Sequence, residues 1–441
     1  MNLKKSISSL KLPHLKGTAG IPTAAIAPPK EVLLPMNMHP GQAAVPVVAV
    51  GDHVRIGQLV AREEGKNSSP VHASISGTVV SVDDSGVRIE SDGKMEKDPA
   101  IAPPQVSDLD GFLQAVRESG IVGLGGAAFP LWAKLDAIRH GPIDTVLVNG
   151  AECEPYITSD NRTMVECGDD IKNGVALLKK YLGSREFIFG IEENKPDAIA
   201  QMRRVFEGDS AVTVMPLKSV YPQGAKQVLL YNATGKVVGE GQRLASLGVI
   251  IINVSSLAKM GQYMRDGMPL VEKFVTVDGP AVKKPGNFRV PIGTPIRTVI
   301  QQAGGLTAAP GKVLMGGPMM GKPMKSMDNP VIKATNAILV LDERAARPVD
   351  ATPCIHCGRC VAVCPLGLNP ASFARAMELE SDGERLDILS RGKVALCMEC
   401  GCCSYVCPAH RPLADTNHKA KGFVRCQIPK DGSNQKKEGA K

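Results

Sequence analysis

Two copies of one cysteine pattern near the carboxyl end constrain this chain more than any other feature of its sequence. The first copy consists of Cys354, Cys357, Cys360 and Cys364, with Pro365 behind them. The second consists of Cys397, Cys400, Cys403 and Cys407, with Pro408 behind them. Both read C-x2-C-x2-C-x3-C-P, a spacing at which bacterial proteins hold [4Fe–4S] clusters. Because such a cluster carries one electron at a time, the pattern predicts a chain through which single electrons pass.

The ligand sets are expected to cross between the two copies. In two-cluster proteins the fourth cysteine of each run ligates the cluster of the other run. Cluster 1 is therefore expected to be held by Cys354, Cys357, Cys360 and Cys407. Cluster 2 is expected to be held by Cys364, Cys397, Cys400 and Cys403. Structural zinc is the main alternative, since paired C-x2-C units also bind zinc, but the repeated four-cysteine run with proline favours iron–sulfur clusters.

Two residues inside the motifs fall outside the ligand spacing. Cys402 is expected to be a packed thiol rather than a ligand. His356, between two ligand cysteines, either donates a hydrogen bond to a cluster sulfur, which would raise its potential, or faces solvent.

Composition is typical of a multidomain globular protein in a reducing compartment. The 441 residues, 43% of them hydrophobic, suggest about three domains. No apolar run approaches the ~18 residues of a membrane span, and the basic N-terminus lacks the apolar stretch of a signal peptide. The formal charge of +8 falls to about +4 once eight ligand thiolates and two cluster cores are included. That charge is too low to predict nucleic-acid binding.

The remaining basic residues gather at the two ends of the chain. Lys4, Lys5, Lys11 and Lys16 lie at one end, and Lys419, Lys421, Arg425, Lys430, Lys436 and Lys437 lie at the other. These groups predict either solvated tails or docking on anionic lipid or a membrane partner.

The order of elements predicts a multidomain α/β protein. The expected parts are an irregular basic N-terminus (1–30), a β-sandwich module (31–105), an α/β domain (106–270), a small β-rich module (271–335), a helical dicluster domain (345–421) and a basic tail (422–441). In the α/β part, strands expected at 145–148, 187–190, 212–215 and 249–254 alternate with helices. This alternation implies a mostly parallel, covered sheet.

The stretch from Gly51 to Gln58, together with residues 73–79, resembles the small β-sandwich of biotinyl and lipoyl carrier domains. Such a carrier needs a lysine at the tip of its hairpin. Residues 68–72 between the two stretches contain none. We therefore expect a structural or docking module without a swinging arm.

A glycine-rich loop opens the α/β domain. Gly123, Gly125 and Gly126 precede Phe129-Pro130 and a helix that carries Lys134. Glycines let the backbone approach a bulky planar or phosphorylated ligand, and helix N–H groups with a nearby lysine would hold a phosphate. Tight helix packing is the alternative explanation for these glycines.

An acidic loop follows the strand expected at 145–148. It carries Asn149, Glu152 and Glu154, with Pro155 behind them. Polar residues just past the carboxyl end of a parallel strand lie where α/β proteins bind ligands. Asn149 and Glu152 are candidates for the edge or ribityl hydroxyls of a flavin, and Glu154 for a nucleotide.

These two loops resemble those of the FMN- and NADH-binding subunit of respiratory complex I. With the turn Tyr221-Pro222-Gln223-Gly224, the sandwich module and the two ferredoxin motifs, residues 30–415 resemble the RnfC subunits of Rnf electron transport complexes. Residues 274–325 are similar to the ligand-binding β-grasp (SLBB) module of the same families.

The resemblance implies an FMN site. The cofactor-binding residues that it implies are Gly123, Gly125, Gly126, Phe129, Lys134, Asn149, Glu152, Glu154, Tyr221, Gly224 and Asn253. Gly123, Gly125 and Lys134 would hold the phosphate and ribityl end. Asn149 and Glu152 would line the isoalloxazine, and Tyr221, Gly224 and Asn253 would close the pocket. Phe129 and Glu154 would meet the nicotinamide nucleotide.

Two departures from the complex I pattern bear on NADH. Ala151 stands where that pattern has an acid, and Ala225-Lys226 where it has paired acids. Lys226 reverses a charge near the expected NADH site, so direct NADH use is less strongly predicted than flavin or cluster binding.

The resemblance implies a peripheral subunit on the cytoplasmic side of the cell membrane, passing electrons between NAD(H), FMN and two [4Fe–4S] clusters. Its expected partners are the other Rnf-type membrane subunits, with ferredoxin reached through the complex and Na+ or H+ as the translocated ion. A cobalamin reductase and a non-catalytic electron-wire subunit without flavin are the alternatives. The sequence identifies no catalytic residue, coupling ion or direction of electron flow.

Overall fold

The computed structural model describes residues 9–427. These residues divide into two compact units, one spanning 11–347 and the other running from 348 onward together with the residues up to Leu10. The larger unit contains three modules, and the smaller unit contains both cysteine motifs.

The N-terminal module of the larger unit is built from two small antiparallel sheets, with strand orders β2-β8-β7-β4 and β3-β5-β6. Its strands are β2 (Glu31–Leu34), β3 (Val45–Pro46), β4 (His53–Val54), β5 (Leu59–Arg62), β6 (Val71–His72), β7 (Gly77–Asp83) and β8 (Gly86–Ser91). Alternate residues such as Val32 and Leu34 are fully buried, as a two-layer packing requires. The predicted β-sandwich is confirmed.

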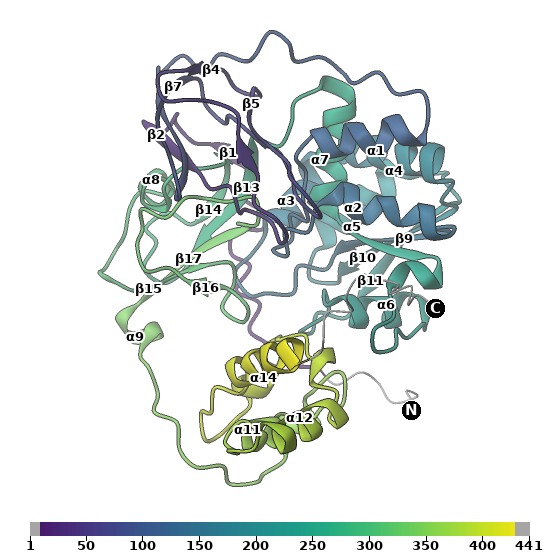
Figure 1. Cartoon of the computed structure of the whole chain (residues 1–441), viewed down its shortest axis with the longest axis vertical. Coiled ribbons are helices and arrows are strands. Elements are labelled where there is room, and N and C mark those ends of the chain that lie inside the picture. The colour runs from purple at the N-terminus through teal and green to yellow at the C-terminus, as the bar shows by residue number, and fades with distance from the viewer. Residues whose placement is uncertain (1–8, 428–441) are drawn as a thin grey trace, which may run out of the picture. The chain divides into compact units, whose positions relative to one another are not determined.

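The next module is a parallel four-stranded sheet with helices on both faces, as predicted (Figure 1). Its strands are β9 (Thr145–Gly150), β10 (Glu186–Glu192), β11 (Val212–Leu217) and β12 (Val249–Asn253). Its helices are α1 (Leu109–Glu118), α2 (Leu131–Leu135), α3 (Ser159–Glu166), α4 (Gly168–Leu182), α5 (Pro196–Val205), α6 (Lys226–Thr234) and α7 (Val254–Asp266), with 3-10 turns at Asp136–His140 and Leu244–Leu247.

Alternation along the strands explains why both faces are covered. Val146 and Val148 of β9 belong to the core that includes residues of α4 and α7. Leu147, between them, points the other way and packs with Leu229 and Leu230 of α6. The apolar run of residues 146–148 is therefore buried on both faces of the sheet, which is typical of parallel sheets.

The strand order creates a switch point at the carboxyl ends of β9 and β12. The chain steps outward from β9 to β10 to β11 and then returns to place β12 on the other side of β9. Open α/β sheets bind ligands where the strand order reverses in this way.

A six-stranded mixed sheet forms the third module. Its elements are β13 (Glu272–Asp278), β14 (Gly286–Pro291), α8 (Ile296–Gln302), β15 (Pro310–Met315), β16 (Lys322–Pro323) and β17 (Ala337–Asp342), followed by α9 (Glu343–Ala346). The segment before the β-sandwich, expected to be irregular, contributes the short strand β1 (Ala24–Ala25) to this sheet, paired with β14.

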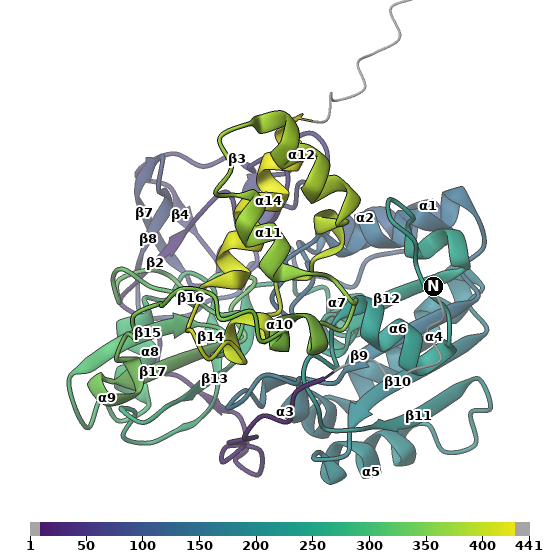
Figure 2. The same ribbon diagram turned by 90° about the horizontal axis from the view of Figure 1, so that it is seen from below.

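The second unit is small and helical, as predicted for the dicluster domain (Figure 2). It contains α10 (Arg359–Ala362), α11 (Pro370–Ala376), α12 (Asp382–Arg391), a 3-10 turn at Val394–Leu396, α13 (Cys402–Tyr405) and α14 (Leu413–Gln427). Phe373, Leu389 and Ala420 are fully buried where α11, α12 and α14 meet. Of the tail expected at 422–441, the first residues continue α14, and residues 428–441 lie outside the described part.

In the part of the chain that the structure describes, no helix combines the length and apolar character needed to span a bilayer.

Candidate functional site: two cluster seats and a nucleotide edge

Five cysteines line one cavity in the second unit: the four predicted for cluster 2, and Cys402, which lies outside the ligand spacing. Cys364 from the first motif lines it together with Cys397, Cys400 and Cys403 from the second. The sulfurs surround a cavity instead of meeting at a point, since among residues 9–427 no three or more His, Cys, Asp or Glu side chains converge closely enough for one metal ion. Thiols with apolar neighbours such as Leu366 and Leu368 are the kind of surroundings in which cysteines hold a [4Fe–4S] cluster.

The site predicted for cluster 1 is more exposed to solvent than the site predicted for cluster 2. Cys360 and Cys407 lie close enough for their charges to interact. The amide of Thr352, just before the first motif, donates to the carbonyl of Ala409, just after the second, over 3.0 Å. The chain around the first motif therefore lies beside the end of the second. Cys357 is exposed, whereas Cys403 is 8% exposed.

Asn417 supplies a hydrogen bond to a ligand sulfur that the sequence did not suggest. Its side chain, 1% exposed, projects from α14, and its Nδ2 donates to Cys397 Sγ over 3.5 Å. The amide of Glu399 donates to the same sulfur over 3.4 Å. His356, by contrast, is exposed. The sequence signal for Asn417 was weak, because it lies 20 residues beyond Cys397 on a helix that the cysteine spacing does not predict.

Asn417→Leu is expected to lower the midpoint potential of cluster 2 and leave that of cluster 1 unchanged. An N–H donor stabilises the more negative, reduced cluster, and about 1 kcal/mol corresponds to roughly 40 mV for one electron. An EPR-monitored redox titration measures both potentials. Asn369→Ala, which removes a cap from α11, is the control. Unchanged potentials in Asn417→Leu would contradict this role.

The glycine loop lies against the carboxyl end of β12. Gly125 and Gly126 are exposed, and a Cβ at Gly125 would lie 2.9 Å from Nδ2 of Asn253, the last residue of β12. Ser256 of α7 ties the loop down, because its Oγ accepts from the amide of Leu124 over 2.9 Å and donates to the carbonyl of Val122 over 3.0 Å. The loop is thus fixed at its base and open at its tip.

Asn149 and Asn253 are register partners at the ends of β9 and β12. Asn149 Nδ2 donates to the carbonyl of Gly224 over 2.9 Å, which brings the Tyr221–Gly224 turn to the same edge. Tyr221 is 1% exposed beneath that turn. Asn253 caps α7 and donates from Nδ2 to Asp160 over 2.7 Å. The switch point therefore collects residues predicted from three separate stretches of sequence.

Lys134 reaches this edge from below the glycine loop. Its Nζ donates to the carbonyl of Ile251 over 2.6 Å. Burial, and then the positive charge of Lys226, lowers the pKa of Lys134 to about 8. A lysine ammonium beside a second cation suits a phosphate.

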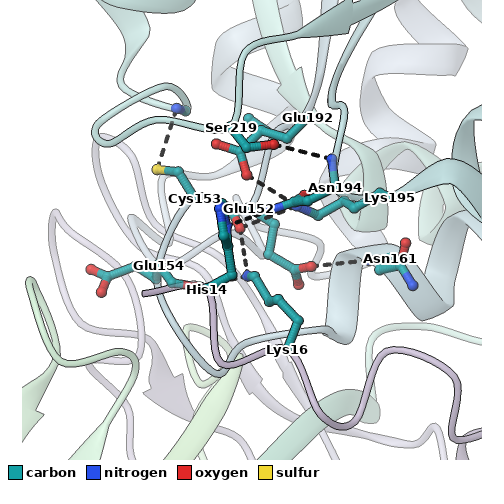
Figure 3. A network of polar contacts seen from close by, with 12 residues as sticks. His14, Lys16, Glu152, Cys153, Glu154, Asn161, Glu192, Asn194, Lys195 and Ser219 are labelled. Atoms are coloured by element: carbon teal, nitrogen blue, oxygen red, sulfur yellow. Dashed lines mark hydrogen bonds and ion pairs between the residues drawn. The ribbon is translucent and has the colours of Figure 1, made fainter. Parts of the chain in front are cut away.

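The acidic loop is held by contacts of its own (Figure 3). The Glu152 carboxylate accepts from the amides of Asp160 and Asn161, over 2.6 and 3.3 Å, at the start of α3. Burial raises the pKa of Glu152 to about 7. Glu154 accepts from the amides of Met319 and Met320 in the six-stranded module, each over 2.9 Å. Both acids thus already have protein partners.

The remaining predicted positions are also placed by the structure. The carbonyl of Gly123 accepts from the amide of Ala128 at the base of the loop over 3.0 Å, and Phe129 is half-buried beside it. Ala151 is fully buried, and a Cβ at Gly224 would lie 3.6 Å from the Cβ of Ala151. The position that is acidic in complex I is therefore occupied here by a buried methyl group beside the Tyr221–Gly224 turn.

Two residues near the site escaped sequence reasoning. Asp160 accepts from Ser255 Oγ over 2.6 Å in addition to Asn253. Lys273 donates to the carbonyl of Leu124 over 2.9 Å, and burial lowers its pKa to about 7. Neither belongs to a motif, so only the folded chain brings them to the glycine loop.

The donors at this edge fit FMN. Exposed glycines without side chains, paired asparagines and a lysine with no adjacent carboxylate together suit a flat, polar and phosphorylated ligand.

Comparison with known proteins agrees with this geometry. Four family profiles match in chain order: the RnfC barrel sandwich hybrid domain at residues 7–97, the Nuo51 FMN-binding domain at 116–262, the SLBB domain at 274–323 and the 4Fe-4S dicluster domain at 350–411. The predicted order of modules is confirmed, and the iron–sulfur interpretation is favoured over zinc.

Several curated proteins are similar over most of their length. The subunit designated C in the Na(+)-translocating ferredoxin:NAD(+) oxidoreductase complex of Acetobacterium woodii is 40% identical over 371 residues, covering 81% of this chain and 84% of that protein. The corresponding subunit of the proton-translocating complex of Clostridium ljungdahlii is 37% identical, covering 81% of each. That of the ion-translocating oxidoreductase complex of Rhodobacter capsulatus is 36% identical, covering 81% of this chain and 71% of that protein.

Fold and site together define an electron-transfer protein with an FMN-binding domain and a 4Fe–4S dicluster domain. The chain belongs to the RnfC family, whose members are subunits of ion-translocating ferredoxin:NAD+ oxidoreductase complexes, the Rnf complexes. The resemblance drawn from the two loops and the cysteine motifs is confirmed.

Proposed function

We propose that this chain passes electrons between NAD(H), FMN and two [4Fe–4S] clusters within a membrane-bound complex that exports Na+ or H+. FMN, when bound, supplies the conversion between a two-electron hydride and single electrons. The names of two relatives specify Na+ in one and protons in the other, so the family alone does not identify the ion.

The observation that carries the flavin part is the meeting of three separate stretches of sequence at one switch point. Asn149 and Asn253 are paired there, with Gly125 against Asn253 and Lys134 beneath. Lys134 would hold the phosphate, and the exposed glycines would let the backbone approach the ribityl chain. Asn149 and Glu152 would line the ring, and Phe129 and Glu154 the nicotinamide nucleotide.

The cysteines would hold the clusters in crossed sets. Cluster 2 would be held by Cys364, Cys397, Cys400 and Cys403, in the cavity that those residues line. Cluster 1, with its exposed Cys357, is the better placed of the two to exchange electrons with a partner.

The chain would work as a peripheral subunit on the cytoplasmic side of the membrane, bound to the other Rnf-type subunits and reaching ferredoxin through them. Co-purification with those subunits from detergent-solubilised membranes, and release of this chain alone by high salt, would support that placement. Recovery free of the other subunits before any salt wash would contradict it.

The advantage of the wild type over Lys134→Met in FMN affinity is expected to change little up to about pH 8 and to shrink above it. Lys134 binds phosphate only when charged, and its pKa lies near 8, so raising the pH removes the counter-charge. The loss should approach about tenfold per pH unit. Fluorescence titration measures it, with Lys134→Met as the control that lacks the step. The same decline in Lys134→Met would contradict the assignment.

A further inference from the structure

The segment before the β-sandwich runs along the acidic loop. The amide of Tyr156 donates to the carbonyl of His14 over 3.2 Å, and Thr18 and Thr158 share a hydroxyl hydrogen bond of 2.6 Å. Asn287 Nδ2 donates to the carbonyl of Thr18 over 2.8 Å. Residues 14–18 are thus fixed on both the α/β module and the six-stranded module.

Lys16 lies at the centre of this contact (Figure 3). Its Nζ donates to three backbone carbonyls of the acidic loop, those of Glu152 over 2.8 Å, Glu154 over 2.7 Å and Ile157 over 2.5 Å. An ammonium group has three N–H donors, so all of them are used inside the protein. Lys16 therefore has no donor left for a ligand and acts on the loop alone.

The loop needs such support because its backbone is strained. Glu152 has φ of +49° and Tyr156 has φ of +70°, both in the left-handed region that non-glycine residues avoid. Such residues persist only where their surroundings over-determine them. Without Lys16, the carbonyls of Glu154 and Ile157 would lose this donor, and the carbonyl of Glu152 would keep only the longer bond from Lys195.

A second lysine, Lys195, lies nearby, but its ammonium group is paired mainly with Glu192. Lys195 is 3% exposed and pairs with Glu192 over 3.2 Å, and it reaches the carbonyl of Glu152 only at 3.4 Å. Among the hydrogen bonds of the described residues, none joins Lys195 to the other two carbonyls that Lys16 binds. Lys16 is the side chain that joins all three.

We infer that Lys16 is an internal cation that holds the acidic loop in its flavin-binding shape, which makes the N-terminal segment part of the flavin site. The inference rests on the proposed function for its flavin part, while its loop part stands on the three carbonyl bonds. Lys16 is a positioning residue, acting through the backbone that carries Glu152 and Glu154.

The test uses the full-length protein with Lys16→Met, which keeps the side-chain length and removes the charge. Hydrogen exchange of peptides covering residues 150–158 should quicken, and FMN binding should weaken by roughly tenfold or more. Lys11→Met, at an exposed lysine of the same segment, is the matched control and should change neither quantity. A far-UV circular dichroism spectrum and a thermal unfolding midpoint close to those of the wild type would show that Lys16→Met still folds.

Chemical rescue separates the cation from general packing. Lys16→Ala should regain FMN affinity with added propylammonium, which supplies a charged N–H donor, and not with tetramethylammonium, which has none. Equal rescue by both, or no change in exchange and affinity in Lys16→Met, would overturn the inference.

The two proposals fail in different ways. A wild-type protein that binds no FMN would refute the proposed function. Hydrogen exchange of residues 150–158, compared between the wild type and Lys16→Met, would still test whether Lys16 holds the loop. Faster exchange in Lys16→Met with wild-type FMN affinity would overturn the link between the loop and the flavin.

Discussion

Replacing Cys364 by alanine is expected to remove the cluster of the second motif and to leave the cluster of its own motif in place. Cys364 lines the same cavity as Cys397, Cys400 and Cys403, so its loss leaves three of the four predicted ligands, beside the non-ligand Cys402. Iron content should fall by about half, and one of two EPR signals of the reduced protein should disappear. Cys402→Ala, at a buried thiol outside the ligand spacing, should keep its full iron content.

Double variants distinguish crossed from uncrossed ligation. If the ligand sets cross between the motifs, Cys364→Ala with Cys403→Ala removes two ligands of the same cluster, and about half of the iron remains. Cys364→Ala with Cys360→Ala damages both seats and removes nearly all of it. Uncrossed sets predict the opposite outcome for each pair, so iron analysis of the two proteins decides the question.

Lys134→Met is expected to weaken FMN binding by about 2–5 kcal/mol, roughly 30-fold to several thousand-fold. The reason is that a phosphate drawn into this edge loses a charged partner that the neighbouring carbonyl of Ile251 cannot replace. Isothermal titration of the flavin-free protein measures the change.

Riboflavin separates the phosphate contact from general damage to the site. It lacks the phosphate, so Lys134→Met should bind riboflavin about as well as the wild type does. Equal losses for FMN and riboflavin would mean that Lys134 only supports the local packing, and the phosphate assignment would fail.

Sequence reasoning predicted residues that meet at this edge of the sheet, but not the contacts that support them. The strand ends were predictable because uninterrupted apolar runs such as that of β9 must be buried on both faces, and polar residues that follow such strands lie at one edge. The pairing of Asn149 with Asn253 follows from strand order, which short-range patterns do not contain.

The N-terminal segment shows where the sequence was misleading. Lys16 belongs to a basic, proline-rich stretch, whose composition favours a solvated tail or a membrane-docking surface. Its three carbonyl partners lie more than 130 residues away in the chain, and no residue pattern signals such a contact. Asn417 is a similar case, since a single asparagine on a helix has no distinctive spacing.

The two departures from the complex I pattern acquire physical meaning in the fold. Ala151 is fully buried beside the Tyr221–Gly224 turn, so an acid at this position would lie out of contact with water. Lys226 adds positive charge near Lys134. An extra cation at this edge is compatible with the phosphate of FMN, and it makes NADPH a nucleotide to compare with NADH in any reduction experiment.

Electron flow from a nicotinamide nucleotide through FMN to the clusters can be followed in a single experiment on the anaerobically purified protein. FMN and iron are quantified, and the flavin and cluster absorbance is recorded while NADH or NADPH is added. We predict about one FMN and two [4Fe–4S] clusters per chain, with flavin and cluster absorbance both bleached by a nicotinamide nucleotide. A full complement of iron with no flavin, and no bleaching by either nucleotide, would contradict the proposed function and leave the chain as an electron wire.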